Sequence, residues 1–208
     1  MYLRVTAFKS DAAKLEQGIA YFKDKVVPAM KKAPGFLGAT CVADRAKSTG
    51  AASTLWESLE SMNKAEQLGQ QARIDSEEAT GLEVVDVDRF EITSLEMAGP
   101  TPELPSYTRI TTAYGDPAKL DKAVELVRDQ VLTRLKGQPG FRAFAAGVNR
   151  MTGRGFTTSS WASAEQREAS NAALDELRQR IGSSGGLYAE QVDLVETVVA
   201  EVKLPARA

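Results

Sequence analysis

Histidine is absent from this 208-residue chain, and cysteine occurs only once. Without histidine the chain can hold neither a Ser-His-Asp nor a Cys-His catalytic arrangement. A metal site would have to consist of carboxylates alone, and no group of Asp and Glu residues has the spacing of such a site. We therefore expect no metal ion and no cofactor.

The single cysteine, Cys41, cannot form an internal disulfide, which favours a reducing compartment. The chain also lacks the basic start and apolar run of a signal peptide, and it has no stretch of about 18 apolar residues that would span a membrane. Its net charge of −2 gives no basic excess that would attract nucleic acid or anionic lipid. Together these absences predict a cytoplasmic protein with no membrane or nucleic-acid partner.

What the chain does contain is an internal repeat. When the sequence is shifted by 105 residues against itself, glycines, prolines and tryptophans coincide without a gap. The matching segments include Tyr2-x-Arg4-x-Thr6 with Tyr107-x-Arg109-x-Thr111, Pro34-Gly35-Phe36 with Pro139-Gly140-Phe141, Trp56 with Trp161, and Gly81-Leu82 with Gly186-Leu187. A match of such residues in one register indicates a tandem duplication.

A proline-rich segment separates the two copies. Residues 98–106 contain three prolines, which cannot donate hydrogen bonds to a sheet and which favour extended backbone. The segment is therefore predicted to be a surface linker. This divides the chain into a first copy, residues 1–97, the linker, and a second copy, residues 107–203.

Each copy has the same predicted order of elements. Alternating β-forming residues predict strands at 2–9 and 107–114. Apolar residues then recur at helical spacing, and they are Leu15, Ile19, Phe22, Val26 and Met30 in the first copy and Leu120, Val124, Val127, Val131 and Leu135 in the second. A hairpin, a second helix and a last strand follow. The predicted hairpin and last strand are 36–46 with 50–58 and 82–90 in the first copy, and 141–150 with 155–163 and 187–202 in the second.

The order strand-helix-strand-strand-helix-strand is that of a ferredoxin-like unit. Helices cover one face of such a sheet, so the other face needs a cover, which the second copy can supply. The predicted fold class is α+β, with two tandem ferredoxin-like βαββαβ units that form an intramolecular dimeric α+β barrel. Because the chain carries its partner copy covalently, we expect a monomeric pseudo-dimer, and further self-association through the helices stays open.

The residues of each copy also resemble those of a known family. A long first helix that ends in Pro-Gly-Phe (34–36) and a Trp-Glu-Ser segment (56–58) that closes the hairpin are similar to antibiotic biosynthesis monooxygenase-like proteins of the dimeric α+β barrel superfamily. The resemblance covers both copies. It implies a cofactor-independent monooxygenase that acts on a hydrophobic aromatic molecule of the quinol or polyketide type.

Two departures narrow what this resemblance implies. The haem-degrading relatives use a histidine as the axial iron ligand, and this chain has none. In the antibiotic monooxygenases an asparagine precedes the hairpin tryptophan by four residues, whereas Ala52 and Thr157 stand at those positions here. The resemblance therefore implies a fold more strongly than it implies one mechanism.

Two repeated pairs of residues are candidates for binding a substrate. Trp56 and Trp161 could stack on an aromatic molecule between sheet and helices, or they could be core residues. Arg4 and Arg109 lie within first strands, and a buried arginine needs a partner. That partner is either an anionic or phenolate substrate or a carboxylate of the protein. The carboxylates considered are Asp88, Glu91, Asp193 and Glu196. For both pairs the structural interpretation is the commoner one in proteins.

The second copy has further polar groups near its tryptophan. Tyr107 could donate a hydrogen bond to a substrate oxygen, and Thr157 stands where the first copy has Ala52. Hydroxyl groups in a mostly apolar pocket orient a phenolic ligand. We therefore favour a site in the second copy, with Trp161, Arg109, Thr157 and Tyr107, over one in the first copy, with Trp56 and Arg4, and we assign no catalytic residue.

Two function classes stay open. The first is an enzyme, a small oxygenase of hydrophobic aromatic molecules. The second is a non-catalytic small-molecule-binding or structural barrel protein. A difference between the copies would separate them, because an open, polar-lined cavity in one copy favours a ligand site. Helices that collapse onto both sheets would favour a structural role.

Overall fold

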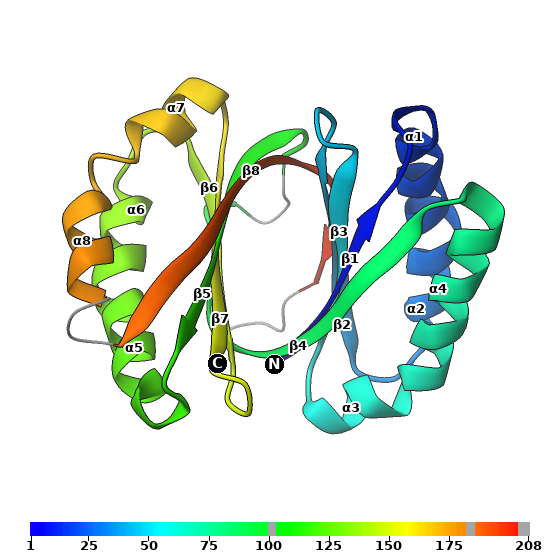
Figure 1. Ribbon diagram of the computed structural model, residues 1–208, viewed down its shortest axis with the longest axis horizontal. Coiled ribbons are helices and arrows are strands. Elements are labelled where there is room, and N and C mark those ends of the chain that lie inside the picture. Colours follow the sequence, from blue (N-terminus) through cyan, green and yellow to red (C-terminus); the bar gives the residue numbers. More distant parts are fainter. Residues whose placement is uncertain (100–102, 182–185, 204–208) are drawn as a thin grey trace. The chain divides into compact units, whose positions relative to one another are not determined.

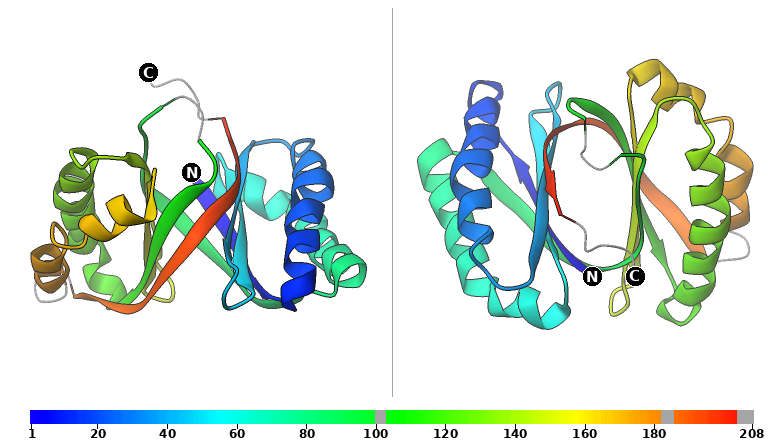
Figure 2. Two further views of the ribbon diagram at one scale, coloured as in Figure 1. Left: turned by 90° about the horizontal axis from the view of Figure 1, so that it is seen from above. Right: turned by 180° about the vertical axis from the view of Figure 1, so that it is seen from behind.

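The computed structural model describes residues 1–99, 103–181 and 186–203. Three residues of the predicted linker, 100–102, lie outside the described residues. The chain divides into two compact units, which we call unit 1 (Met1–Arg89 with Thr197–Ala208) and unit 2 (Phe90–Glu196). In each unit helices lie against one face of a sheet (Figure 1). Figure 2 shows this layering from two further directions.

Unit 1 holds most of the first copy. Its elements are β1 (Tyr2–Lys9), α1 (Ala12–Tyr21), η1 (Phe22–Val26), α2 (Val27–Met30), β2 (Phe36–Asp44), β3 (Thr49–Trp56), α3 (Leu59–Lys64), α4 (Glu66–Thr80) and the start of β4 (Glu83–Met97). A serine caps α3, because the Ser58 hydroxyl accepts a hydrogen bond from the backbone N–H of Ser61. At the other end of the helical layer, Gly81 adopts a left-handed conformation that ends α4.

Unit 2 repeats this order. Its elements are β5 (Ser106–Gly115), η2 (Pro117–Lys119), α5 (Leu120–Leu126), η3 (Val127–Leu132), α6 (Thr133–Lys136), β6 (Phe141–Asn149), β7 (Arg154–Trp161), α7 (Ala164–Ala169), α8 (Asp175–Arg180) and the start of β8 (Leu187–Val202). Ser163 caps α7 in the same way as Ser58 caps α3, with the Gln166 N–H as donor. The local sequence signals of the repeat thus produce the same local structure twice.

The last strand of each copy begins in its own unit and ends in the other. From Glu91 onward β4 pairs with β6 in unit 2. The end of β8 belongs to unit 1, where the Lys203 N–H donates to the Leu37 carbonyl oxygen. The hydrogen-bonded order of the described strands is β1-β3-β2-β8-β5-β7-β6-β4, and this order closes as in a barrel. The predicted α+β class with two ferredoxin-like units is confirmed, whereas the exchange of strand ends is not evident from the repeat.

The two hairpins share one register. Arg4 lies opposite Thr54 in unit 1, and Arg109 lies opposite Ser159 at the equivalent place in unit 2. Residues directly opposite each other on neighbouring antiparallel strands point to the same face of the sheet. Each arginine therefore shares a sheet face with the hydroxyl group across from it.

The long first helix contains a π turn in both copies, η1 and η3, at equivalent positions. Pro28 follows the π turn in the first copy, and the helix continues through it to Met30. The second copy has its π turn without a proline, so the turn is a property of the repeat and not an effect of Pro28. π turns of this kind are frequent next to functional sites.

The core of each unit lies between its helices and its sheet. Buried residues of unit 1 include Leu15, Ile19, Val27, Trp56 and Met62. Those of unit 2 include Val131, Leu135, Phe144, Trp161 and Leu177. Among the helices of the described chain, none has the length and apolar character that crossing a bilayer requires.

Candidate functional site

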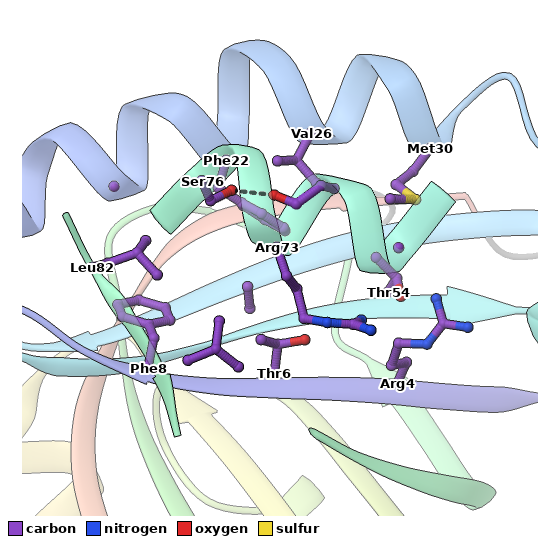
Figure 3. A pocket seen from close by; sticks show the side chains of 15 residues that line it. Arg4, Thr6, Phe8, Phe22, Val26, Met30, Thr54, Arg73, Ser76 and Leu82 are labelled. Atoms are coloured by element: carbon purple, nitrogen blue, oxygen red, sulfur yellow. Dashed lines mark hydrogen bonds between the residues drawn. The ribbon is translucent and has the colours of Figure 1, made fainter. Parts of the chain in front are cut away.

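A cavity of about 70 Å³ lies in unit 1 between β1 and β3 of the sheet and the helical layer (Figure 3). Its apolar lining is Phe8, Phe22, Val26, Met30, Leu82 and Val84. Its polar lining is Arg4, Thr6, Thr54, Arg73 and Ser76. Four small residues complete it, namely Gly18, Ala52, Gly69 and Ala72. The cavity thus has a large apolar surface and a basic end, and no acidic side chain lines it.

Arg4 is the most deeply buried charged group at the cavity, with 3% of its surface exposed. Its Nη2 group donates to the Met62 carbonyl oxygen at 2.6 Å and lies 2.8 Å from Glu66 Oε2. Its Nε and Nη1 atoms are buried without a hydrogen-bond partner. Burial lowers the pKa of the Arg4 guanidinium, and the nearby Glu66 carboxylate offsets part of that effect. A buried guanidinium with two unused donors is costly unless something binds them.

Glu66, the first residue of α4, joins three arginines. Its Oε1 lies 2.9 Å from Arg73 Nη2, and its Oε2 lies 2.8 Å from both Arg4 and Arg89. Burial acts to raise the pKa of Glu66, but hydrogen bonds from Arg89 and Arg73 and the charge of Arg4 outweigh it, so the pKa is lowered. One carboxylate is thus shared by three cations, and the cluster keeps an excess of positive charge.

Gly69 leaves room for both arginines that line the cavity. A Cβ at this position would lie 2.6 Å from Arg4 Nη1 and 3.5 Å from Arg73 Nη1. The first distance is shorter than any real Cβ contact, so a side chain at residue 69 would displace the Arg4 guanidinium. Figure 3 shows Arg4 extending from β1 toward the helices and Arg73 extending from α4 toward β1.

The second copy has large aliphatic side chains where the first has small ones. Leu174, Leu177 and Ile181 occupy the repeat positions of Gly69, Ala72 and Ser76. Leu174 and Leu177 are buried, and Ile181 packs against the same core cluster. That cluster also contains Val127, Val131 and Leu135, the counterparts of the lining residues Phe22, Val26 and Met30. The space that is open in the first copy is therefore occupied by core side chains in the second.

Arg109 has a different environment from Arg4. Its Nη1 group donates to the Ser170 hydroxyl at 2.8 Å, and its Nη2 group donates to the Arg167 carbonyl oxygen at 2.6 Å. Asn171 stands at the repeat position of Glu66. The residues that line the described cavity all belong to the first copy. The sequence had favoured the second copy.

Neither tryptophan is among the residues that line the cavity. Trp56 and Trp161 are both fully buried. Their indole N–H groups donate to Thr54 Oγ1 at 3.0 Å and to Ser159 Oγ at 3.2 Å. Trp56 is nevertheless close to one lining residue, because Arg4 Cζ lies 5.9 Å from the centroid of the Trp56 ring. The indoles have the contacts of core residues with satisfied N–H groups.

The other sequence-derived candidates are distributed as follows. Tyr107 lies opposite Trp161 and Thr157 lies opposite Thr111, both half-buried in unit 2, and neither is among the residues that line the cavity. The prediction that Arg4 pairs with Asp88 or Glu91 was wrong, because the carboxylate that it contacts is that of Glu66. Glu91 instead binds Arg150 at 2.7 Å. Glu66, Gly69 and Arg73 lie at the site but were not predicted from the sequence. The sequence feature that could have indicated them is the difference between the two copies along the second helix.

Within the described residues, no group of three or more Cys, Asp and Glu side chains is arranged to hold a metal ion. The polar groups of the cavity are guanidinium and hydroxyl groups, which bind anions and hydrogen-bond acceptors. The chemistry of the site is therefore that of anion recognition beside an apolar surface.

Comparison with known proteins supports the fold. No family model matches the chain. Two uncharacterised proteins of Mycobacterium tuberculosis are similar to it along nearly its whole length, one with 23% identity, covering 99% of this chain and 91% of that protein, and one with 25% identity, covering 99% and 86%. The similarity thus extends over most of the length of both relatives, and their names state no activity.

Three solved structures resemble the chain in fold. An anthrone oxidase-like protein has a TM-score of 0.70 at 18% identity and covers 100% of this chain and 96% of its own. A candidate monooxygenase of Lactobacillus acidophilus has a TM-score of 0.67 at 12% identity, covering 97% and 96%. A Listeria monocytogenes ferredoxin-fold protein related to antibiotic biosynthesis monooxygenases has a TM-score of 0.52 at 8% identity, covering 95% of each chain. The chain therefore has the α+β fold of these structures, and its activity must be argued from its residues.

Proposed function

We propose that this chain is a small-molecule monooxygenase-like protein whose first copy binds the substrate. The observation that carries this proposal is the buried Arg4 guanidinium, which lines a cavity and has two donor atoms without partners. Buried polar groups are nearly always hydrogen-bonded, so such donors indicate a missing acceptor. The acceptor would be an anionic oxygen of a molecule whose apolar part contacts Phe8, Phe22 and Leu82.

The size of the cavity limits the substrate. About 70 Å³ is well below the 300–1,000 Å³ typical of pockets that bury a drug-sized ligand, and below the roughly 150 Å³ that holds benzene in an engineered cavity. We therefore propose a compact substrate with a short branched chain, because a benzene ring already exceeds this space. A fused polyketide of several rings exceeds this space.

Oxygenation without a cofactor is chemically consistent with this lining. An electron-rich anion can react with O₂ directly, and conversion of an activated CH₂ group into C=O places one oxygen atom in the product and one in water. The protein would contribute binding and electrostatics, since guanidinium groups stabilise the anionic form of the substrate. The apolar wall would keep bulk water from the reacting carbon.

A non-catalytic binding protein is the second candidate, and one observation favours it. The polar lining consists of arginine, threonine and serine side chains, so no lining group is suited to accept a proton at neutral pH. A binder needs no such group. An oxygenase with this site requires a substrate that is ionised before it enters.

An oxygen electrode separates these two functions. We expect the wild-type chain to consume O₂ in proportion to added acetylacetone, a short 1,3-diketone with an activated CH₂ group, at an alkaline pH where it is ionised. Ala72→Leu/Ser76→Ile, which fills the cavity with the side chains that the second copy has at these positions, should consume none. Arg109→Met, at the matching position of unit 2, is the control and should retain activity. Binding without O₂ consumption would support the non-catalytic function. If Ala72→Leu/Ser76→Ile were as active as the wild-type chain, the cavity would be excluded as the site.

A further inference from the structure

The Nη1 atoms of Arg4 and Arg73 converge beside Gly69. Arg4 reaches this place from the sheet and Arg73 from helix α4, and both side chains line the cavity (Figure 3). Arg4 is almost fully buried, whereas 18% of the Arg73 side chain is exposed. Two guanidinium groups that meet at one glycine form a cradle for a single anionic group.

The cradle has more positive than negative charge around it. Three arginines and one glutamate form the charged cluster, and Glu66 uses both of its oxygens to hold the arginines. Glu66 is not among the cavity-lining residues. Because Glu66 faces Arg4, Arg73 and Arg89 together, one carboxylate leaves two positive charges unbalanced. A second carboxylate in the cavity would reduce that imbalance and use the unpartnered donors of Arg4.

We propose that the ligand of the first copy is a small carboxylic acid, bound as its carboxylate between Arg4 and Arg73 with a compact apolar body against Phe8 and Leu82. This inference rests on the proposed function, because it names the substrate class of the same cavity. Glu66 is a positioning residue in this arrangement, since it holds both guanidinium groups and does not contact the ligand.

The ionisation of the ligand decides between a carboxylic acid and a phenol. A carboxylic acid has a pKa near 4 and is ionised at neutral pH, whereas a phenol with a pKa near 10 is not. A phenol would have to give up its proton inside the cavity, and the lining holds no group suited to take it. A carboxylate arrives already charged and needs no base.

The apolar lining excludes a fully hydrated inorganic anion. Phe8, Phe22 and Leu82 offer no hydrogen bonds to replace the hydration shell of sulfate or phosphate. A carboxylate on a small hydrocarbon body matches both surfaces, because its charged end meets the arginines and its apolar end meets these residues.

Calorimetric titration of the full chain tests the inference with isobutyrate and propionate against their neutral amides, isobutyramide and propionamide. We expect the carboxylates to bind about tenfold or more tightly than the amides, the order expected for a hydrogen bond to a charged group. Arg4→Met should remove this preference. Arg73→Met, at a more exposed position, serves the same purpose if Arg4→Met does not fold, and Arg109→Met should keep the preference.

Each outcome has a distinct meaning. If amides and carboxylates bind equally to the wild-type chain, the cavity stands as a binding site and the carboxylate inference is wrong. If carboxylates bind but keep their preference in Arg4→Met and Arg73→Met, the cradle is not their site. If none of the four compounds binds, the inference and the proposed binding site both fall.

Discussion

Gly69 and Leu174 occupy the same position of the repeat and have opposite roles. Leu174 is buried in the core of unit 2, whereas the missing side chain of Gly69 leaves space that Arg4 Nη1 enters. Two further small residues of α4, Ala72 and Ser76, extend this difference. At these repeat positions the described residues thus differ, with small side chains around the cavity of unit 1 and buried leucines in unit 2.

This difference predicts opposite effects of matched substitutions on stability. Leu177→Ala removes a buried side chain in unit 2 and should lower the free energy of unfolding by about 2–5 kcal/mol. Ala72→Leu, at the matching position of unit 1, should leave that free energy unchanged or raise it by about 1 kcal/mol, because the side chain enters existing space. Urea unfolding followed by circular dichroism measures both. A large loss of stability in Ala72→Leu would mean that the cavity cannot accept the side chain.

The fold could be predicted from the sequence because its signals are local and occur twice. Glycines at turns, serine caps and a tryptophan on the third strand define each unit without knowledge of the rest. The exchange of strand ends could not be predicted. From Glu91 onward β4 pairs with β6, which belongs to the other copy, and no local sequence pattern specifies that pairing. Pairing between distant segments leaves no mark in a comparison of the two copies.

The site was harder to predict for a different reason. The residues that the copies share include Trp56 and Trp161, which are core residues with satisfied indole N–H groups. The cavity is created by what they do not share, at Gly69 and at Glu66. A small residue in a helix carries no signal of its own, and it becomes informative only beside the leucine that replaces it.

Glu66→Gln should destabilise the protein at neutral pH and have little effect in acid. The substitution leaves Arg4 buried without its carboxylate, which should cost about 1–3 kcal/mol. The pKa of Glu66 is lowered in the folded state, so its contribution is present above the unfolded pKa of about 4.3 and is lost as pH falls through the folded pKa. Urea unfolding at pH 7 and at stepwise lower pH measures this.

The control for this experiment is Glu60→Gln, which breaks an exposed ion pair with Lys64 and should not change stability measurably. A difference between wild type and Glu66→Gln that stayed constant down to the lowest pH would contradict the role of the Glu66 charge.

Cys41 should be unreactive in the folded protein. Its side chain is fully buried, and burial raises the pKa of its thiol to about 12. Thiolate is the reactive form, so a disulfide reagent at pH 8 should label Cys41 only through unfolding. A ligand that binds the folded state should slow this labelling further. Rapid labelling of the native protein would show that β2 opens locally.

The two tryptophans should differ as reporters of binding. In Trp161→Phe the remaining indole, Trp56, lies next to Arg4, so isobutyrate should change its emission. In Trp56→Phe the remaining indole, Trp161, lies in the filled core of unit 2 and should not respond. Circular dichroism verifies that both variants are folded. A response from Trp161 alone would move the site to the second copy.

The arginine side-chain N–H groups give the most direct test of a ligand site around Arg4. In a ¹H–¹⁵N spectrum, the Nε–H signal of Arg4 can be identified by its absence in Arg4→Lys, and that of Arg109 by its absence in Arg109→Lys. We predict that isobutyrate shifts the Arg4 signal in a saturable way, that isobutyramide does so only weakly, and that the Arg109 signal stays in place. An Arg4 signal that does not move while isobutyrate binds, or an Arg109 signal that moves in its stead, would contradict the account.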